Sequence, residues 1–283
     1  MSVKIIVDST ADMIQEVEKR VKIVPLTVHF GEKEYVSGVD IDSKKFYEML
    51  VEGDVLPTTS QPTPFAFEEA FREAVEEGYE VVCLTCSGKL SGTNQSANIA
   101  AAEFPGKVHV VDSGTIAIGL GILAEHALYL LDKGLSAEEI AWKLMCKREK
   151  IRLLALVDTL EYLKKGGRIS PALAFAGGML NIKPVITLSG GEIKLLGKAR
   201  GSRQGNNLLV QEIEKAGGVD FTRPLLLGYT GLSDALLRKY IADSAQMWEG
   251  QREELPISIV GSVVGTHVGP GAVAVAFFAA DEE

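Results

Sequence analysis

Cysteine, histidine and long apolar runs are scarce in this 283-residue sequence, and each scarcity excludes a class of protein. Only three cysteines are present, too few for a secreted fold held together by disulfides, so we expect a reduced, cytoplasmic protein. No apolar run reaches the ~18 residues of a membrane-spanning helix, and the N-terminal residues lead into an apolar strand rather than a signal peptide. The four histidines are dispersed without metal-ligand spacing, so we expect neither a metal nor another cofactor.

Positive charge is also in short supply. The chain has 29 lysines and arginines against 38 aspartates and glutamates, a formal net charge of -9. This excess of acidic residues argues against nucleic acid as a general partner. The composition, 46% hydrophobic and 24% charged, is that of an ordinary globular protein. We therefore expect a fully folded chain with a sizeable core.

Two common catalytic signatures, GxxxxGK and GxSxG, are absent, which argues against a nucleotide P-loop and a hydrolase elbow. Gly119, Gly121 and Ala124 match GxGxxA, but inside a helix-like segment, so we interpret the match as helix packing. Cys83 and Cys86 form a CxxC pair inside a predicted strand. Residues three apart in a strand face opposite sides, so we expect no redox or zinc role for the pair.

The order of the predicted elements indicates an α/β fold in two domains. In residues 1–158, apolar strands at 3–7, 80–86, 108–111 and 151–157 alternate with helices, which predicts a parallel sheet wrapped by helices. In residues 159–283, a helix at 170–180 and a hairpin of 181–188 with 192–198 precede two strand–helix repeats. The pattern predicts a smaller α+β domain there.

The segment 80–97 combines a buried strand, a loop of small polar residues and a helix for which Thr93 is the expected N-cap. The free N–H groups and the dipole of such a helix start favour an anion. Ser87 and Ser91 add hydroxyl donors to this loop. The alternative is a tight strand-to-helix turn that is capped only for stability.

Asp8, Asp112 and Asp158 each follow an apolar strand. Carboxylates at the ends of parallel strands can hold Mg²⁺ for phosphoryl transfer, but Asp-Ser and Asp-Thr pairs are also ordinary helix caps, which we favour. Ser91, His267 and one of these aspartates also permit a hydrolase. An enzyme that uses Asp8, Asp112 and Ser91, as a phosphotransferase or a hydrolase, is therefore the alternative function.

Two basic clusters stand out in this acidic chain, one at 164–168 that includes Arg168 and one at 198–203 that includes Arg200 and Arg203. Each cluster is either a docking or phosphate-contacting patch or an ordinary solvated surface. The segment 266–271 either brings His267 to a site or forms a Gly/Pro turn with an incidental histidine.

Six segments resemble, in order along the chain, motifs of the DegV family of bacterial fatty-acid-binding proteins. They are 7–10 (VDST), 59–62 (TSQP), 90–93 (LSGT) with 95–97 (QSA), 165–170 (KGGRIS), 182–185 (IKPV) and 266–271 (THVGPG). They extend from residue 7 to residue 271, so the resemblance covers essentially the whole chain as one DegV-type unit over residues 3–280.

The resemblance implies a two-domain DegV-like fold that holds one long-chain fatty acid in an apolar tunnel and is not itself an enzyme. The residues that it places at the carboxylate are Thr59 and Ser91 as hydrogen-bond donors, with Ser60, Ser87, Gly92 and His267 around them.

The resemblance also implies a protein partner. A fatty acid kinase would dock on a face that includes Arg168 and would phosphorylate the bound acid to an acyl phosphate for phospholipid synthesis. From the second basic cluster, we expect Arg200 and Arg203 to contribute to kinase docking or phosphate contact. Asn94 stands where the family commonly has an aromatic residue, and Cys86 stands where it commonly has serine. We expect these two departures to change the shape of the site and its chain preference.

Overall fold

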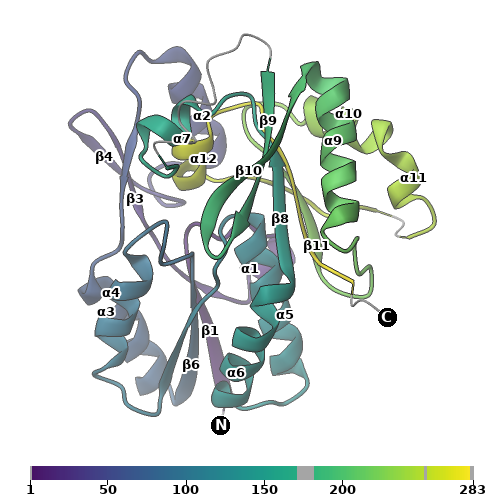
Figure 1. The fold of residues 1–283 in the computed structure, drawn as a ribbon. Coiled ribbons are helices and arrows are strands. Elements are labelled where there is room, and N and C mark those ends of the chain that lie inside the picture. Colours follow the sequence, from purple (N-terminus) through teal and green to yellow (C-terminus); the bar gives the residue numbers. More distant parts are fainter. Residues whose placement is uncertain (1, 171–181, 252–253, 281–283) are drawn as a thin grey trace.

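The computed structural model describes residues 2–170, 182–251 and 254–280, and these residues form three sheets with helices around them (Figure 1). The sheets have four, six and three strands. The predicted α/β class with a parallel sheet is confirmed. The helix predicted at 170–180 lies outside the described residues.

The first sheet is parallel, with the strand order β2-β1-β6-β7. Its strands are β1 (Ser2–Asp8), β2 (Lys22–Val24), β6 (Tyr79–Thr85) and β7 (Val108–Asp112). Helices α3 (Pro64–Glu76) and α4 (Thr93–Ala101) cover one face, and α5 (Ile118–Asp132) and α6 (Ala137–Lys147) cover the other (Figure 1). Because strand side chains alternate between the faces, Cys83 packs with α3 and α4 whereas Cys86 packs in the core with α5.

The second sheet has the order β10-β9-β8-β13-β11-β12, and only its β11–β12 pair is parallel. Its strands are β8 (Ile151–Leu156), β9 (Ile182–Ser189), β10 (Glu192–Arg200), β11 (Leu225–Tyr229), β12 (Ile257–Ile259) and β13 (Val273–Phe278). Helices α9 (Gly201–Lys215), α10 (Ala235–Asp243) and α11 (Ala245–Trp248) lie on its outer side (Figure 1). The hairpin predicted around residue 190 is confirmed as β9 and β10.

The prediction that residues 151–157 belong to the parallel sheet is wrong. Strand β8 pairs antiparallel with β9 and β13 in the six-stranded sheet. A buried strand has the same apolar pattern in either kind of sheet, so the pattern did not identify its neighbours. The six-stranded sheet therefore begins at Ile151. The domain boundary at residue 158 stays a prediction.

The third sheet is small and antiparallel, with the order β4-β3-β5. Its strands are β3 (Thr27–Phe30), β4 (Lys33–Val36) and β5 (Thr58–Ser60). Helices α2 (Ser43–Glu52) and α12 (Ser262–Val268) share a core with it, and α7 (Glu161–Lys165) contacts α12. The short α1 (Gln15–Glu18) and a 3₁₀ turn, Arg148–Lys150, complete the described elements.

Helix α5 lies between the parallel sheet and the six-stranded sheet and belongs to the core that both share. A Cβ atom on Gly121 would lie 2.0 Å from the carbonyl oxygen of Asp12, so glycine permits the close approach of these backbones. This contact confirms that the GxGxxA match serves helix packing. Within the described residues, no helix is long and apolar enough to cross a membrane.

Candidate functional site

Two narrow cavities, of about 50 and 60 Å³, meet beside the six-stranded sheet. They share the lining residues Ile116, Ile193, Val264 and Val268, so the two cavities adjoin, and we call the pair the path. The first cavity has a polar end that includes Thr59, Ser91, Arg168 and His267. The second cavity has an apolar wall built largely from β8, β9, β11 and β13. The path therefore changes from polar to apolar along its length.

The polar end pairs Thr59 of β5 with His267 of α12. The Thr59 hydroxyl oxygen lies 2.9 Å from His267 Nε2, and no described residue bonds to His267 Nδ1. Burial, aided by the positive charge of Arg168, lowers the pKa of His267 to about 4, so the imidazole is neutral at pH 7. When Nε2 donates to the Thr59 oxygen, the hydroxyl proton of Thr59 is free to bond a ligand.

Ser91 lies on the opposite side of this end, in the loop before α4. Its hydroxyl bonds to the hydroxyl of Thr93 at 2.8 Å and accepts the Thr93 backbone N–H at 3.3 Å. The predicted cap is wrong, because Gly92 is the N-cap and Thr93 is the first helical residue. Gly92 has no side chain to cap the helix, and the Ser91 hydroxyl instead accepts the first N–H of α4.

Arg168 follows α7 and also lines the first cavity. Its Nε donates to the carbonyl of Leu90 at 3.2 Å, and its Nη1 donates to the carbonyl of Gly166 at 2.6 Å. These bonds fix a guanidinium charge at the polar end of the path. The sequence motif indicated Arg168 as a docking residue, and its place beside Ser91 and His267 was missed.

The other residues predicted around a carboxylate line neither cavity. The Ser60 hydroxyl lies 2.9 Å from His29 Nε2, on the face of β5 opposite to Thr59. The Ser87 hydroxyl donates to the carbonyl of Gly191 at 2.7 Å and so joins the loop before α4 to the β9–β10 hairpin. A Cβ atom at Gly92 would lie 2.1 Å from Gln61 Oε1, so this glycine permits close packing.

Further lining residues escaped the sequence analysis. Thr10, Leu26, Leu163 and Val263 contribute to the first cavity from four separate segments of the chain. Each residue belongs to an apolar or capping pattern, and such patterns also occur in the hydrophobic core and the turns of any protein. Their convergence depends on the packing of α12 against the small sheet, which no local pattern reveals.

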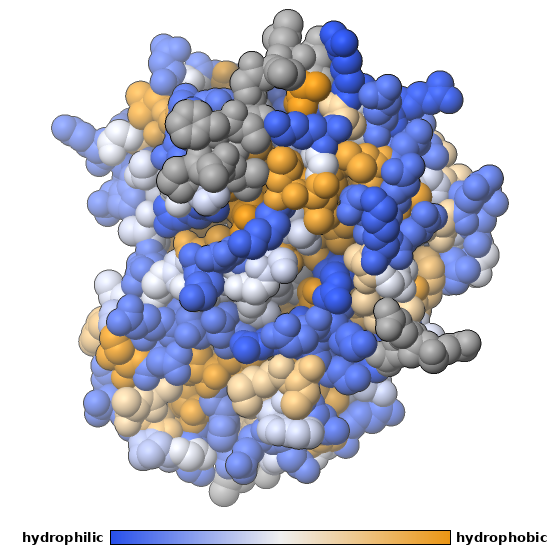
Figure 2. Space-filling view, in the orientation of Figure 1, coloured by the Kyte–Doolittle hydropathy of each residue, from blue (hydrophilic) through white to orange (hydrophobic). Residues whose placement is uncertain are grey.

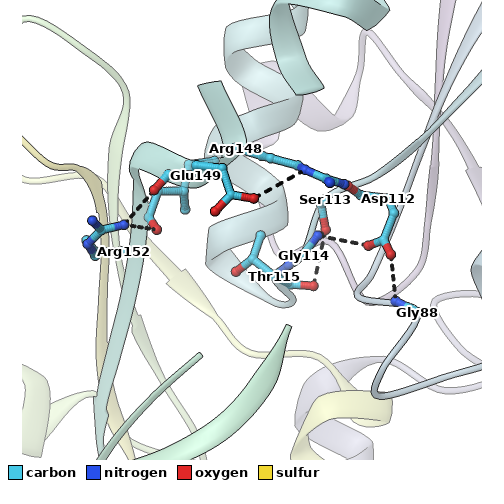
Figure 3. Close-up of polar contacts among 9 residues, drawn as sticks. Gly88, Asp112, Ser113, Gly114, Thr115, Arg148, Glu149 and Arg152 are labelled. Atoms are coloured by element: carbon cyan, nitrogen blue, oxygen red, sulfur yellow. Dashed lines mark hydrogen bonds and ion pairs between the residues drawn. The ribbon is translucent and has the colours of Figure 1, made fainter. Parts of the chain in front are cut away.

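The interpretation of the strand-end aspartates as helix caps is wrong, because Ile14, Ala117 and Leu160 are the N-caps of the helices that follow them. Asp8 and Asp112 instead stabilise loops. Buried Asp8 accepts the N–H of Thr10 at 2.9 Å and of Cys86 at 2.7 Å, and burial raises the pKa of its carboxyl. Asp112 accepts the N–H of Gly88 at 3.2 Å and of Gly114 at 2.9 Å, as Figure 3 shows.

The third aspartate, Asp158, is half exposed and forms an ion pair with Lys183. No cluster of metal-ligating side chains occurs among the described residues. Ser91 bonds to Thr93 and His267 bonds to Thr59, so the described contacts do not pair Ser91 with a histidine base.

A wider groove of about 760 Å³ borders the second cavity, with which it shares Thr187 and Leu188. Figure 2 shows apolar surface over β9 and β10 beside charged side chains. Figure 3 shows Arg148 and Glu149 in this groove, where they form an ion pair at 3.8 Å. Two of its lysines also have carboxylate partners, in the Lys194–Glu192 pair at 2.7 Å and the Lys215–Glu212 pair at 2.6 Å.

The predicted docking residues Arg200 and Arg203 line neither the groove nor the two cavities. Arg200 ends β10, and Arg203 follows in the first turn of α9, where both side chains are exposed. Their predicted contact with a kinase stays a prediction.

Comparisons with known proteins agree with this architecture. The family model described as "Uncharacterised protein, DegV family" matches residues 2–280. A DegV domain-containing protein of Deinococcus radiodurans is 36% identical over 284 aligned positions, which cover 98% of each chain.

Two solved structures are also similar. A fatty-acid-binding DegV family protein of Thermus thermophilus is 35% identical, with a TM-score of 0.87 over 98% of this chain and 100% of that one. A stearic-acid-binding protein of Eubacterium ventriosum is 30% identical, with a TM-score of 0.86 over 98% of this chain and 97% of that one. The family match, the relatives and the shared fold identify this chain as a member of the DegV family.

Proposed function

We propose that this protein binds one long-chain fatty acid, with the carboxylate at Thr59, Ser91 and Arg168 and the acyl chain along the two cavities. The observation that carries the proposal is that a cavity with hydrogen-bond donors adjoins a cavity with a largely apolar lining. The fatty acids described for the similar proteins of Thermus thermophilus and Eubacterium ventriosum support the same ligand class.

The polar end offers what a buried carboxylate needs. Burying an ionised carboxylate without partners costs many kcal/mol, so the site must offer donors or positive charge. The Thr59 and Ser91 hydroxyls and the guanidinium of Arg168 meet at this end. Arg168 adds a full positive charge to the two hydroxyl donors.

The apolar cavity accounts for the affinity. Each buried methylene contributes ~0.8 kcal/mol, so about 14 methylenes contribute roughly 11 kcal/mol before the entropy of association is subtracted. The tail therefore supplies most of the binding free energy, while Thr59 and Ser91 orient the head group. This division between tail affinity and head-group orientation suits a protein that holds a ligand for a second protein to act on.

We further propose that this chain is a cytoplasmic carrier rather than an enzyme, and that a fatty acid kinase phosphorylates the carboxylate to an acyl phosphate for phospholipid synthesis. Support comes from the motif resemblance and from the described contacts, which give Ser91 no base and the strand-end aspartates structural partners. Exposed Arg200 and Arg203 offer positive charge for such a contact.

The ligand assignment is tested by a double variant, Thr59→Ala with Ser91→Ala. We expect it to lose the fatty acid that the parent retains, because both hydroxyl donors disappear from the polar end. The measurement is native mass spectrometry of the purified proteins, followed by extraction and identification of the lipid. Ser60→Ala is the matched control, since its hydroxyl lies on the other face of β5. Equal lipid retention in parent and double variant would refute the assignment of these residues.

The carrier role is tested by incubating the protein with ATP, Mg²⁺ and oleate, with and without a bacterial fatty acid kinase. We expect acyl phosphate only when the kinase is present. Acyl phosphate formed by the protein alone would support the alternative enzyme instead.

A further inference from the structure

The wall of the second cavity is a row of paired residues that crosses four strands of the six-stranded sheet. Ile186 of β9 pairs with Ala155 of β8, Ala155 pairs with Ala274 of β13, and Ala274 pairs with Gly228 of β11. Directly paired residues point to the same face of a sheet. All four residues line the cavity, so this row forms one side of it.

Three successive positions of the row, Ala155, Ala274 and Gly228, have small side chains or none. The adjacent row on the same face, Leu153, Ala276 and Leu226, has two leucines and packs in the core around α5. The small residues therefore form a shallow trough beside a raised edge, and the cavity lies over this trough.

The trough extends away from the polar end. It begins beside β10, whose Ile193 lines both cavities, and it reaches β11 at Gly228. Neighbouring strands lie ~4.8 Å apart, so three strand spacings give a length of roughly 14 Å. This is the length of the wall that an acyl chain would follow beyond the point where the two cavities adjoin.

The far end of the trough is tight. A Cβ atom on Gly228 would lie 3.1 Å from Ile118 Cγ2 and 3.4 Å from Val260 Cγ2. A methyl group there would occupy the remaining space between β11, α5 and the segment before α12. An added carbon at Gly228 would press on Ile118, which would have to move slightly, and it would close this end of the trough.

The geometry points to Ala155, Ala274 and Gly228 as the residues that set the length of the acyl chain, with Gly228 at the position of the chain's methyl end. This inference rests on the proposed function and adds the substrate class, which is unbranched long-chain acids held in single file. A branched chain would need width that a trough one residue wide does not offer.

The test compares Ala274→Val and Gly228→Ala with Ala276→Val. Ala276 is the matched control because it lies on the same strand and face, two residues from Ala274, but outside the cavity and fully buried in the packed core. Delipidated proteins are titrated with decanoate, palmitate and stearate, and folding is verified by circular dichroism.

We expect both trough variants to bind stearate at least ~tenfold more weakly relative to decanoate than the parent does. The control should keep the parent's ratio. The inference is overturned when the folded trough variants keep that ratio, or when Ala276→Val changes it equally. A parent that binds none of the three acids would refute the proposed function itself, which is a different result. Gly228→Ala keeps the test decisive if Ala274→Val does not fold.

Discussion

Asp12 is a buried carboxyl with a single described partner. Its Oδ1 accepts the N–H of Gly261 at 2.8 Å, and its Oδ2 bonds to no described residue. Burial raises the pKa of Asp12 to about 8, and the nearby Asp8 adds to this effect. The carboxyl is therefore largely protonated at neutral pH in the folded protein, although it is ionised in the unfolded chain.

A pH-dependent stability follows from Asp12. Between pH ~4 and ~8 the folded state holds the proton and the unfolded state does not, so the free energy of unfolding falls as the pH rises. Asp12→Asn should remove this fall in the free energy of unfolding, which amounts to up to ~5 kcal/mol between pH ~4 and ~8. The measurement is urea unfolding at several pH values, with Asp54→Asn at an exposed position as the control. An unchanged pH dependence in Asp12→Asn would contradict the account.

Arg168 acts on its neighbour His267 through charge. Burial is the larger cause of the low pKa of His267, and Arg168 is the second. Arg168→Gln should therefore raise the pKa of His267 while leaving it below the usual value, as NMR titration of the ring would show. The same variant should bind palmitate roughly tenfold or more weakly, because a charged hydrogen bond contributes ~1.5–3 kcal/mol.

Arg152→Gln is the control for this experiment, since Arg152 lies in the wide groove rather than in the cavity. A His267 that titrates identically in the parent and in Arg168→Gln would show that the guanidinium does not act on the ring.

At this scale the sequence motifs predicted part of the site. Thr59, Ser91 and His267 do meet at the polar end of the path. Ser60 and Ser87 do not line it, because strand alternation points Ser60 away and a contact with Gly191 occupies Ser87. Arg168 was assigned to a docking face because a motif gives a residue's neighbours in sequence and not the direction of its side chain.

Helix α12 is the element on which the site depends most. It supplies Val263, Val264 and Val268 to the cavities and His267 to the polar end. It packs against α2, where a Cβ atom on Gly265 would lie 2.6 Å from the hydroxyl oxygen of Tyr47. The Tyr47 hydroxyl donates in turn to the carbonyl of Val260 at 3.0 Å. The position of α12 is thus fixed by close contact.

Gly265→Ala should destabilise the protein by roughly 1–3 kcal/mol through overpacking against α2, and it should reduce retention of palmitate because α12 shifts. Urea unfolding and lipid extraction measure the two effects. In a Tyr47→Phe background the loss should be smaller, since the variant lacks the hydroxyl that the new methyl group meets. A Gly265→Ala protein as stable as the parent would show that the contact adjusts without cost.

The elements themselves were predicted unevenly. Strands and helices of the parallel sheet came close to their observed positions, because long periodic patterns are specific. The apolar stretch 21–30 divides at Pro25 into β2 and β3, which belong to different sheets. A Gly/Pro turn was one of two alternatives for the segment 266–271. This segment contains the end of α12, a seven-residue helix too short to show a period.

At the scale of the whole molecule, the two larger sheets share the core around α5, and each has a further core on its other face. A count of strand–helix repeats cannot reveal this arrangement. In the sequence, a helix that is buried on both sides differs from a helix buried on one side only by a few more apolar residues. The predicted boundary at residue 158 reflects a change of pattern along the chain, whereas β8 already pairs within the six-stranded sheet.

The cavities lie where these parts meet. Ile116 and Ala117 precede α5. Val260 precedes α12 and Val264 lies in it, whereas Ile186 belongs to the six-stranded sheet. A ligand in this position would contact segments that are far apart in the chain. It should therefore stabilise the protein as a unit, by RT ln(1 + [L]/Kd), or ~2.7 kcal/mol at a free ligand concentration about 100 times Kd.

This stabilisation separates the roles of the tail and the head group. Adding palmitate to delipidated protein should raise Tm by roughly 5–10 °C for a chain of this size. Hexadecanol carries the same tail without the carboxylate, so it should raise Tm by less in the parent. In Thr59→Ala with Ser91→Ala, the two molecules should differ less than in the parent, because only Arg168 still favours the carboxylate. Differential scanning calorimetry measures all four combinations. A double variant that discriminates palmitate from hexadecanol as strongly as the parent does would show that Arg168, rather than Thr59 and Ser91, recognises the head group.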